Sequence, residues 1–462
     1  MEPFQYHVYV CDQQKPEGVP CCTASGSRAM IDELRRQIVA QGLANDVQIT
    51  TCGSLGLCER GPNMVVYPEG VWYSGVRAED VREIVDSHFR QGRPVSRLVN
   101  TDAAALATEV CANRDRYLAS LRARDAAGVM PDELAQSIRG FQESRVILTA
   151  LELDLFTAIG SGATAAQAAA AAGTDARATE MLLHALASLE LVRKQGAVFH
   201  NAPVAARFLA AASPASARMA MLHTARLWHR WSGLTECVRT GTTAPDDDRG
   251  AEGTEAFIAA MHNNARQRAV PLAQAAAAGA SRMLDVGGGS GAYAIAFAQA
   301  NPQLRAEVFD QPAVLAIAQR HIREAGLEDR ISTRVGDLRT DEFGGGYDLV
   351  LLSAICHMLS EEENRNLLAR VYRALAPGGR VAIQDFLLRA DKTGPRAAAL
   401  FSLNMLVNTR GGASYSEDEY TRWLREAGFG EVRRIPLPGP AGVLVGQIVN
   451  LRPIGGALWA RP

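Results

Sequence analysis

The stretch MLDVGGGSGAYAIAFAQA, residues 283–300, most constrains the fold of this chain. It reads as an apolar strand, a turn of glycines and an apolar helix. Glycines are needed where a backbone passes so close to a ligand that a Cβ would collide, and the start of a helix offers free N–H groups to an anionic part of that ligand. The stretch therefore predicts a nucleotide-type cofactor at the end of a buried strand. Because Gly287, Gly289 and Ala292 satisfy the G-x-G-x-x-A pattern, NAD is one alternative.

Strands and helices alternate from this loop to the end of the chain, which predicts an α/β fold with a parallel sheet covered on both faces. Asp310 ends the next predicted strand, where an acid can bind ribose hydroxyls of either cofactor. VGD at 335–337, YDLVLLSAICH at 347–357, the turn APGGR before VAIQDF, and a terminal pair of strands near EVRRIPL and GVLVGQIVN follow. This succession resembles the S-adenosylmethionine-dependent methyltransferases, whose seven-stranded sheet ends in an antiparallel strand. No second mononucleotide-binding half for NAD follows.

The resemblance narrows to the O-methyltransferases of the plant caffeate type. It rests on VILTALELDLFTAI, LLHALASLELV, EAFIAAMHNNAR, LDVGGGSG, VFDQPAV, ICHMLSEEEN, LAPGGRVAIQDF and GGASYSEDEYTRWLREAGF. It implies a helical, winged-helix-like dimerisation domain at residues 136–245, a Rossmann-like methyltransferase domain at residues 255–455, and a homodimer. A winged helix is also typical of DNA-binding modules, but a net charge of −2 gives no electrostatic reason to expect nucleic acid.

The resemblance also implies which residues contact S-adenosyl-L-methionine. Gly287, Gly289, Asp310 and Asp337 carry over position by position, and Asp285 at the end of the strand before the loop completes the predicted cofactor site.

Methyl transfer to a hydroxyl also needs a group that collects its proton. A phenol has a pKa of about 10 and a histidine one of about 6.5, so histidine is the ordinary base at neutral pH. His357 follows the predicted buried strand LVLLSAIC at its carboxyl end, where open α/β sheets hold their sites. The resemblance implies that His357 is the catalytic base and that Asp385 orients it. The alternatives are a core or surface histidine and a carboxylate that only caps a strand.

The sequence departs from the family around this histidine. The family's usual Asp-Trp is Met358-Leu359, the acid of its Gly-Gly-x-Glu string is replaced by Ser414, and a lysine near the cofactor falls at Ser353. The predicted site is therefore less polar than that of the plant relatives.

Five of the eight cysteines lie in the first 58 residues, two of them in TTCGSLGLCERGP at 50–62. Thiolates that bind an iron–sulfur cluster converge from separate loops, and small neighbours leave room for the cluster and let backbone N–H groups reach its sulfurs. A structural zinc site and unrelated buried thiols are the alternatives, although a CxxC pair is absent.

Residues 7–99 resemble the thioredoxin-like [2Fe-2S] ferredoxins through VYVCDQQ, CCTASGS, TTCGSLGLCERGP and MVVYPEGVWYSGV. This resemblance implies a thioredoxin-like ferredoxin domain at residues 1–100, followed by a helical linker at 101–135. The implied ligands of the [2Fe-2S] cluster are Cys11, Cys22, Cys52 and Cys58. Many family members space the last pair as C-x3-C, which would place a ligand at Ser54.

Together these features predict an O-methyltransferase that acts on a hydroxyl of a small organic molecule and is fused to a ferredoxin module. The alternative is an electron-transfer or redox-sensing protein with a redox partner, whose methyltransferase fold serves docking or regulation. The N-terminus lacks an export signal, and no stretch approaches eighteen uninterrupted apolar residues. We therefore expect a cytoplasmic protein that contacts neither membrane nor nucleic acid.

Overall fold

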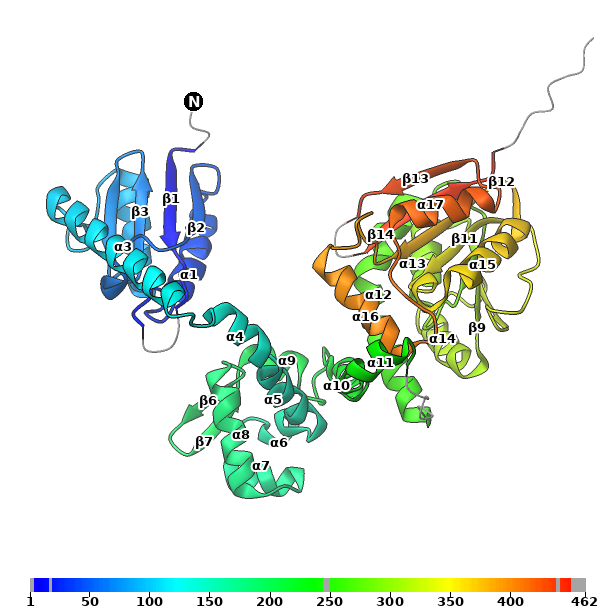
Figure 1. Cartoon of the computed structure of the whole chain (residues 1–462), viewed down its shortest axis with the longest axis horizontal. Helices are drawn as coiled ribbons and strands as arrows, with labels where there is room; N and C mark the ends of the chain where they lie inside the picture. Colours follow the sequence, from blue (N-terminus) through cyan, green and yellow to red (C-terminus); the bar gives the residue numbers. More distant parts are fainter. Residues whose placement is uncertain (1–3, 16–18, 244–249, 438–440, 450–462) are drawn as a thin grey trace, which may run out of the picture. The chain divides into compact units, whose positions relative to one another are not determined.

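The computed structural model describes residues 4–15, 19–243, 250–437 and 441–449. Figure 1 labels its helices and strands. Among the residues described, no helix combines the length and the apolar character needed to cross a lipid bilayer. Contacts divide the chain into two compact units, Met1–Gly140 and Phe141–Pro462.

The first unit contains a mixed four-stranded sheet in the order β2-β1-β3-β4. Its elements are β1 (Tyr6–Cys11), α1 (Ser27–Ala40), β2 (Val47–Cys52), η1 (Cys58–Arg60), β3 (Asn63–Tyr67), β4 (Val71–Ser74), η2 (Ala78–Asp80), α2 (Val81–Ile84) and η3 (Val85–Phe89). β1 and β2 run parallel, whereas β3 is antiparallel to both β1 and β4. These strands lie in the sequence strings YHVYV, DVQITT, NMVVYP and VWYSGV.

Regular alternation builds the core of this unit. Along β1, Val8 and Val10 are buried and Tyr9 between them is half-buried, because successive side chains of a strand point to opposite faces. Met30 and Leu34, one turn apart on α1, belong to the same buried cluster. The amphipathic helix α1 therefore covers this sheet.

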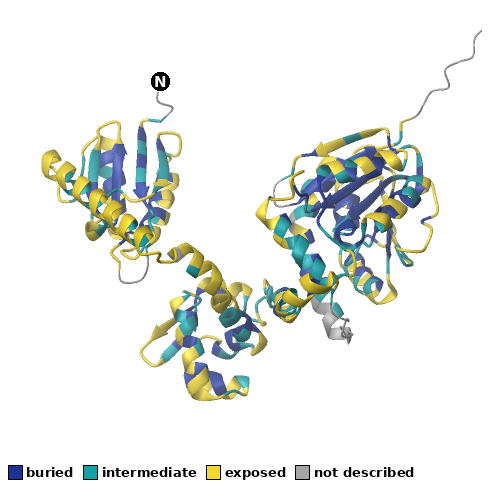
Figure 2. Cartoon of the chain, in the orientation of Figure 1, coloured by how far each residue is buried: buried dark blue, intermediate teal, exposed yellow. Residues whose placement is uncertain are grey.

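Two largely exposed helices follow, α3 (Ala103–Ala126) and α4 (Asp132–Arg139) (Figure 2). The side-chain amide of Asn113 on α3 donates a 2.6 Å hydrogen bond to the carbonyl of Gly56 in the cysteine loop. The segment 101–135, expected to be a helical linker, thus contains a helix that belongs to the first unit and contacts its cysteine loop.

The second unit begins with a helical part that holds a small three-stranded sheet in the order β5-β7-β6. Its elements are α5 (Phe141–Glu152), α6 (Leu155–Ile159), β5 (Ala163–Thr164), α7 (Ala165–Ala172), α8 (Ala176–Ser188), β6 (Val192–Gln195), β7 (Val198–Asn201) and α9 (Pro203–Phe208). The Thr164 side chain caps α7 in a reciprocal pair with Gln167, and Gly173 ends the helix with a positive φ. The alanine-rich segment is therefore a helix with a defined start and end.

A seven-stranded sheet forms the rest of the unit, in the order β10-β9-β8-β11-β12-β14-β13. The elements are α10 (Arg218–Ser232), α11 (Leu234–Thr240), α12 (Gly250–Ala276), β8 (Arg282–Val286), α13 (Ala292–Ala300), β9 (Arg305–Asp310), α14 (Pro312–Glu324), β10 (Ile331–Val335), β11 (Tyr347–Ser353), η4 (Cys356–Met358), α15 (Glu361–Ala374), β12 (Leu375–Asp385), α16 (Arg396–Asn408), α17 (Glu417–Glu426), β13 (Glu431–Ile435) and β14 (Gly442–Gln447). β14 runs antiparallel to both neighbours and the other adjacent pairs are parallel. The predicted sheet with its antiparallel end is confirmed.

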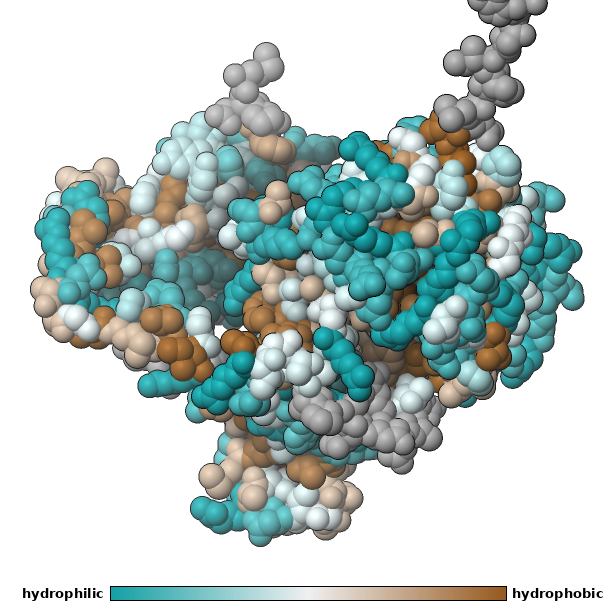
Figure 3. All heavy atoms as spheres, turned by 45° about the vertical axis from the view of Figure 1, so that its right-hand side comes forward, coloured by the Kyte–Doolittle hydropathy of each residue, from teal (hydrophilic) through white to brown (hydrophobic). Residues whose placement is uncertain are grey.

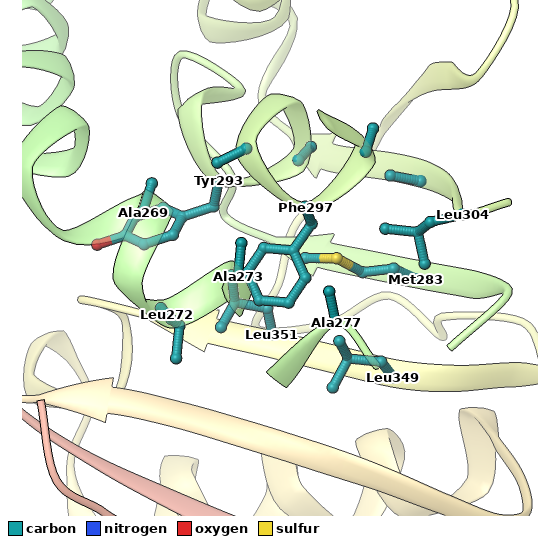
Figure 4. Packing of buried hydrophobic residues seen from close by; sticks show 14 of the residues in the cluster. Ala269, Leu272, Ala273, Ala277, Met283, Tyr293, Phe297, Leu304, Leu349 and Leu351 are labelled. Atoms are coloured by element: carbon teal, nitrogen blue, oxygen red, sulfur yellow. The ribbon is translucent and has the colours of Figure 1, made fainter. Parts of the chain in front are cut away.

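Helices cover both faces of this sheet. Phe297 of α13 and Ala273 of α12 pack with Met283 and Leu351 of the strands on one face (Figure 4). On the other face, α15 and α17 pack against the alternate strand residues, with Trp423 fully buried. The parallel strands consequently end at one edge, and strand order reverses between β8 and β11, where open α/β sheets bind ligands.

The outer faces of these helices are charged. Arg365 of α15 pairs with Glu426 of α17 at 3.0 Å, and Arg422 pairs with Glu361 at 3.0 Å. Figure 3 shows hydrophilic residues over much of the visible surface of this part. Such exposed pairs add little stability, so burial of the inner faces holds the helices in place.

Candidate active site

The glycine loop lies between β8 and α13, as the sequence predicts. Gly287 and Gly289 have φ angles of 65° and 58°, which glycine adopts without the cost that a Cβ imposes. A Cβ on Gly287 would lie 2.3 Å from Ile355 Cδ1, whereas one on Gly289 would meet nothing within 4 Å. Gly287 is therefore required by the protein's own packing, and Gly289 borders open space.

Asp285, at the end of β8, is 1% exposed, and neither carboxylate oxygen has a hydrogen-bond partner among the described residues. Burial raises the pKa of its carboxyl to about 7, opposed by the nearby Ala294 N–H and reinforced by the charge of Asp310. A buried carboxylate without a partner is costly, which is the behaviour of a group that awaits a cationic ligand.

Asp310 ends β9 and is fixed against the glycine loop. One oxygen accepts from Gly289 N at 2.9 Å and the other from Gln311 N at 2.7 Å. Burial raises the pKa of Asp310, although these two N–H groups oppose the shift. A carboxylate has about four acceptor positions, so two remain for the hydroxyls of a ribose.

Asp337 follows β10 at the same edge of the sheet. Its Oδ1 accepts a 2.8 Å hydrogen bond from Arg339 N, and its own N–H donates to Asp341 Oδ2 at 2.9 Å. The structure thus places all five predicted cofactor residues at the ends of three adjacent strands.

The loop has one contact that the sequence analysis missed. His262 of α12 shares a 2.8 Å hydrogen bond between its Nδ1 and the Oγ of Ser290. Burial, followed by the charges of His321 and Arg266, lowers the pKa of His262 to about 4. A neutral imidazole therefore holds the loop at neutral pH.

His357 and Asp385 lie together at the ends of β11 and β12. His357 Nδ1 is 2.7 Å from Asp385 Oδ1, and His357 N donates to Asp385 Oδ2 at 3.1 Å. Both side chains are buried. An ionised carboxylate can only accept a hydrogen bond, so Nδ1–H of His357 donates to Asp385 and Nε2 is left as the proton acceptor.

Tyr420 of α17 is a third member of this group. Its hydroxyl donates to Asp385 Oδ2 at 3.1 Å from within a fully buried position. Desolvation, together with the charge of Asp385, holds the pKa of Tyr420 well above its ordinary value. Tyr420 therefore remains a donor throughout the working pH range and steadies the carboxylate.

The turn that carries His357 has an unusual backbone. Ala354, directly after β11, has a φ of 57°, which costs a residue with a Cβ about 1–2 kcal/mol. Its N–H donates to the carbonyl of Gln384 at 2.9 Å. A non-glycine residue in this conformation between a strand and the candidate base indicates that the turn is fixed by its surroundings.

Aromatic rings enclose one side of His357. The ring of Phe401 on α16 stands edge-on to the imidazole, with centroids 4.8 Å apart, and Phe386 stacks on Phe401 at 4.2 Å. The guanidinium of Arg268 on α12 lies 5.4 Å from the centre of the Phe386 ring. This side of the site is suited to a planar apolar ligand.

The positions that depart from the plant family are filled by neutral groups. Ser353 Oγ donates to Gln384 Oε1 at 3.0 Å, and the hydroxyl of Tyr293 donates to the same oxygen. Ser414 is buried, and its Oγ has no hydrogen-bond partner among the described residues. Ser353 and Ser414, two of the positions that depart from the plant family, are thus neutral groups in the folded protein.

A model of the O-methyltransferase domain matches residues 240–430, and a model of the O-methyltransferase dimerisation domain matches residues 135–211. The 3-hydroxy-5-methyl-1-naphthoate 3-O-methyltransferase of Streptomyces sahachiroi is 38% identical over 331 residues, which cover 68% of this chain and 95% of that protein. The chain belongs to this O-methyltransferase family. It is an S-adenosylmethionine-dependent O-methyltransferase with a helical dimerisation domain, which indicates a homodimer.

Solved structures of O-methyltransferases support the same assignment. PigF with SAH is 28% identical, covers 69% of this chain and 100% of its own, and superposes with a TM-score of 0.65. Human N-acetylserotonin methyltransferase in complex with SAM is 26% identical, covers 69% of this chain and 97% of its own, and has a TM-score of 0.61. Residues 1–134 of this O-methyltransferase lie outside both family models.

The predicted cluster ligands lie in that N-terminal segment. Cys11 and Cys52 face each other in register at the ends of β1 and β2. A hydrogen bond from the Cys22 thiol lowers the pKa of Cys11 to about 6, and the same bond raises the pKa of Cys22. Cys58 instead contacts Lys15 Nζ at 3.1 Å and Ser54 Oγ at 3.2 Å.

The described residues contain no group of three or more histidine, cysteine or acidic side chains arranged to hold a metal ion. The surroundings nevertheless suit sulfur ligands. The Asn63 amide donates to Cys22 Sγ at 3.4 Å, and a Cβ on Gly61 would lie only 2.9 Å from the same sulfur. The donor types and the close glycine therefore fit an iron–sulfur cluster, while the four sulfurs do not converge.

Proposed function

We propose that this O-methyltransferase methylates a hydroxyl of a small aromatic molecule and that His357 is the base that collects the hydroxyl proton. The observation that carries the proposal is the 2.7 Å contact between His357 Nδ1 and Asp385 Oδ1 at the carboxyl edge of the sheet. The relative from Streptomyces sahachiroi is named for methylating a hydroxyl of a naphthoate. In this chain, the stacked rings of Phe386 and Phe401 offer a flat contact surface for an aromatic acceptor.

The chemistry assigns each residue a separate task. S-adenosylmethionine supplies the methyl group on a sulfonium, and as the new O–C bond forms the S–C bond breaks and leaves a neutral thioether. The hydroxyl proton moves to Nε2 of His357, and Asp385 stabilises the resulting imidazolium. Tyr420 keeps Asp385 in place. Phe401 excludes water from one side of the imidazole, which favours alignment of the reacting atoms in a dry pocket.

The cofactor would be held by the strand ends described above. Asp285 would accept from the ammonium group of S-adenosylmethionine, which explains why a buried carboxylate is kept without a protein partner. Asp310 would accept from the ribose hydroxyls, and the open space beside Gly289 would receive the nearest part of the ligand. Asp337 lies at the end of the next strand, β10, and would border the adenine ring of the cofactor.

Product analysis tests this proposal. The purified chain is incubated with S-adenosylmethionine that carries ¹³C in its methyl group and with phenols and naphthols, each paired with an analogue whose hydroxyl is blocked as an ether. We expect a new methoxy carbon signal only with the free hydroxyls. A methyl signal on a ring carbon or a nitrogen, or labelling of the blocked analogues, would contradict O-methylation.

We also propose that the N-terminal unit is a ferredoxin module with a [2Fe-2S] cluster on Cys11, Cys22, Cys52 and Cys58. The strand order β2-β1-β3-β4 supports a thioredoxin-like domain, and the contact of Cys11 with Cys22 and the register of Cys11 with Cys52 support a shared site. The module would exchange electrons with a redox partner protein.

Metal analysis tests the module. Anaerobically purified protein should contain about two iron and two acid-labile sulfide ions per chain, the content of a [2Fe-2S] cluster. Cys58→Ala should remove or alter its visible absorption, whereas Cys111→Ala, at an exposed cysteine of α3, should not. Stoichiometric zinc without sulfide would contradict the cluster. If Cys52→Ala has the same spectrum as the parent, Cys52 is not the third cluster ligand, and the family spacing would place that ligand at Ser54.

A further inference from the structure

Arg268 is a half-buried cation on α12 beside the aromatic side of the site. Its guanidinium lies 5.4 Å from the centre of the Phe386 ring, Phe386 stacks on Phe401 at 4.2 Å, and Phe401 touches His357 at 4.8 Å between centroids. Two stacked rings therefore separate this cation from the candidate base. A flat molecule that reaches His357 along these rings would end near the guanidinium.

Arg268 has no counter-ion within the part of the chain that the structure describes. Asp385, the acid next to Phe386, is bound to His357 and Tyr420. The charge of Arg268 acts on the hydroxyl of Tyr293, but this group is neutral and donates its proton to Gln384. Withdrawing a guanidinium from water without pairing it is unfavourable, so the position is arranged for an anion that the protein does not supply.

We propose that Arg268 binds a carboxylate on the methyl acceptor, which makes the acceptor a hydroxylated aromatic acid. This inference rests on the proposed O-methylation at His357. A guanidinium is planar, remains charged and forms paired hydrogen bonds with a carboxylate, so it fixes both the position and the rotation of a flat ring. The hydroxyl at the other end is thereby aimed at Nε2 of His357.

The carboxylate of S-adenosylmethionine is the other anion that this site can contain. The charge of Arg268 also acts on Tyr293 of α13, the helix after the glycine loop, but its direct ring contact is Phe386, which follows β12 and belongs with His357. This position favours the acceptor as the source of the carboxylate. Independent measurements of cofactor binding and acceptor binding show which of the two carboxylates Arg268 contacts.

A matched pair of acceptors tests the inference. The compounds are 3-hydroxy-1-naphthoate and 2-naphthol, which differ only in the carboxylate. Charge-assisted hydrogen bonds of this kind correspond to a preference of about 10- to 100-fold in kcat/KM for the naphthoate. Arg268→Met, which keeps the apolar stem, should abolish the preference chiefly through KM and leave 2-naphthol unaffected. Arg268→Lys should restore part of it.

Two controls complete the experiment. Arg396→Met removes an exposed charge on α16, the helix that carries Phe401, and should leave the preference intact. Calorimetry with 1-naphthoate, which has no hydroxyl, measures carboxylate binding without turnover, and Arg268→Met should weaken it about 10- to 100-fold.

The outcomes are distinguishable. If the parent methylates both acceptors equally and 1-naphthoate binds Arg268→Met as well as the parent, the inference is overturned while O-methylation stands. Weaker S-adenosylmethionine binding by Arg268→Met, with both acceptors affected alike, would assign Arg268 to the cofactor and also overturn it. If neither acceptor is methylated but 1-naphthoate binding still depends on Arg268, the carboxylate site stands and the proposed reaction fails.

Discussion

Asp285 illustrates at the scale of one residue how a binding site is maintained at a cost in stability. Its carboxyl is fully buried, has no hydrogen-bond partner among the described residues, and lies near a second acid, Asp310. Each of these conditions opposes ionisation, and together they raise its pKa to about 7. The ordinary value for an aspartate is about 3.9, so folding changes the proton affinity of this group strongly.

Asp285→Asn should therefore stabilise the ligand-free protein at alkaline pH. The folded protein retains a proton on Asp285 that the unfolded chain releases above pH ~4, so stability falls as pH rises from about 4 to 7. The asparagine removes this loss. We therefore expect the free energy of unfolding to rise by an amount on the order of 1–4 kcal/mol at pH 8, and this gain should shrink towards pH 4. Chemical denaturation of both proteins across this pH range measures it.

Asp348→Asn is the matched control for this effect. Burial acts on Asp348 too, but hydrogen bonds from Ser281 and Arg282 outweigh it and lower its pKa. Its ionised form is therefore favoured by folding, and its neutralisation should destabilise the protein at pH 8.

S-adenosylmethionine affinity should fall about 10- to 100-fold in Asp285→Asn alone. An unchanged affinity there would exclude Asp285 as the partner of the ammonium group.

His357→Ala should lower turnover by about 10²- to 10⁴-fold, the usual contribution of a positioned general base. The loss should shrink as pH approaches the pKa of the phenol, about 10, because an ionised hydroxyl needs no base. Asp385→Asn and Tyr420→Phe should act in the same direction more weakly, since they disturb only the orientation of the imidazole. Initial rates from pH 6 to 10 measure this, and a parent-like rate at neutral pH would make His357 a structural residue.

The sequence allowed the residues at the strand ends to be predicted, and those on the helices to a much lesser degree. Asp310, His357 and Asp385 each follow an apolar run, and parallel strands necessarily bring such positions to one edge. Tyr420 contacts Asp385 from 35 positions further along the chain, and no local pattern marks it. Arg268 likewise appears in a helix like any surface arginine, and only the packing of α12 places it over Phe386.

The glycine loop shows at the scale of an element that identical residues can serve different purposes. Gly287 leaves room for Ile355, so its replacement would disturb the protein itself. Gly289 also has a positive φ, but it borders open space. A sequence motif cannot distinguish these two roles, because both appear only as glycine.

Gly289→Ala should therefore fold and lose cofactor affinity. Gly326→Ala, after α14, is its control, because Gly326 has a φ of 66° and also has nothing within 4 Å of an added Cβ. Each substitution should cost about 1–2 kcal/mol of stability for the left-handed backbone. Only Gly289→Ala should bind S-adenosylmethionine more weakly, as measured by calorimetry. Equal affinities of the two variants would show that the cofactor does not approach Gly289.

The elements of the first unit were also predictable in part. The strands at VYVCDQQ and MVVYPEGVWYSGV are present, and β1 shows the period-two burial that depends only on local sequence. The convergence of four thiols was not found, since the Cys58 side chain turns to Lys15 and Ser54. Side-chain direction within a glycine-rich loop depends on partners that a spacing pattern does not contain.

At the scale of the whole molecule, the chain joins an O-methyltransferase to a unit outside the family models. The dimerisation domain indicates that two such chains associate. α4, at the start of the region matched by that domain, carries Leu134 and Ile138 one turn apart, with 52% and 60% of their surfaces exposed. Adjacent apolar side chains on one helical face are typical of a surface that another chain covers.

Ile138→Asp should accordingly weaken the homodimer. Burying an isoleucine contributes about 1.5–3 kcal/mol, and a charge in its place adds a desolvation penalty, so the dissociation constant should rise at least about tenfold. Light scattering over a dilution series should show monomers at concentrations where the parent is dimeric. Val39→Asp on α1, where the side chain is 70% exposed, should leave the mass unchanged. If the Ile138→Asp variant instead dimerises like the parent, the contact between subunits lies on other helices of the dimerisation domain.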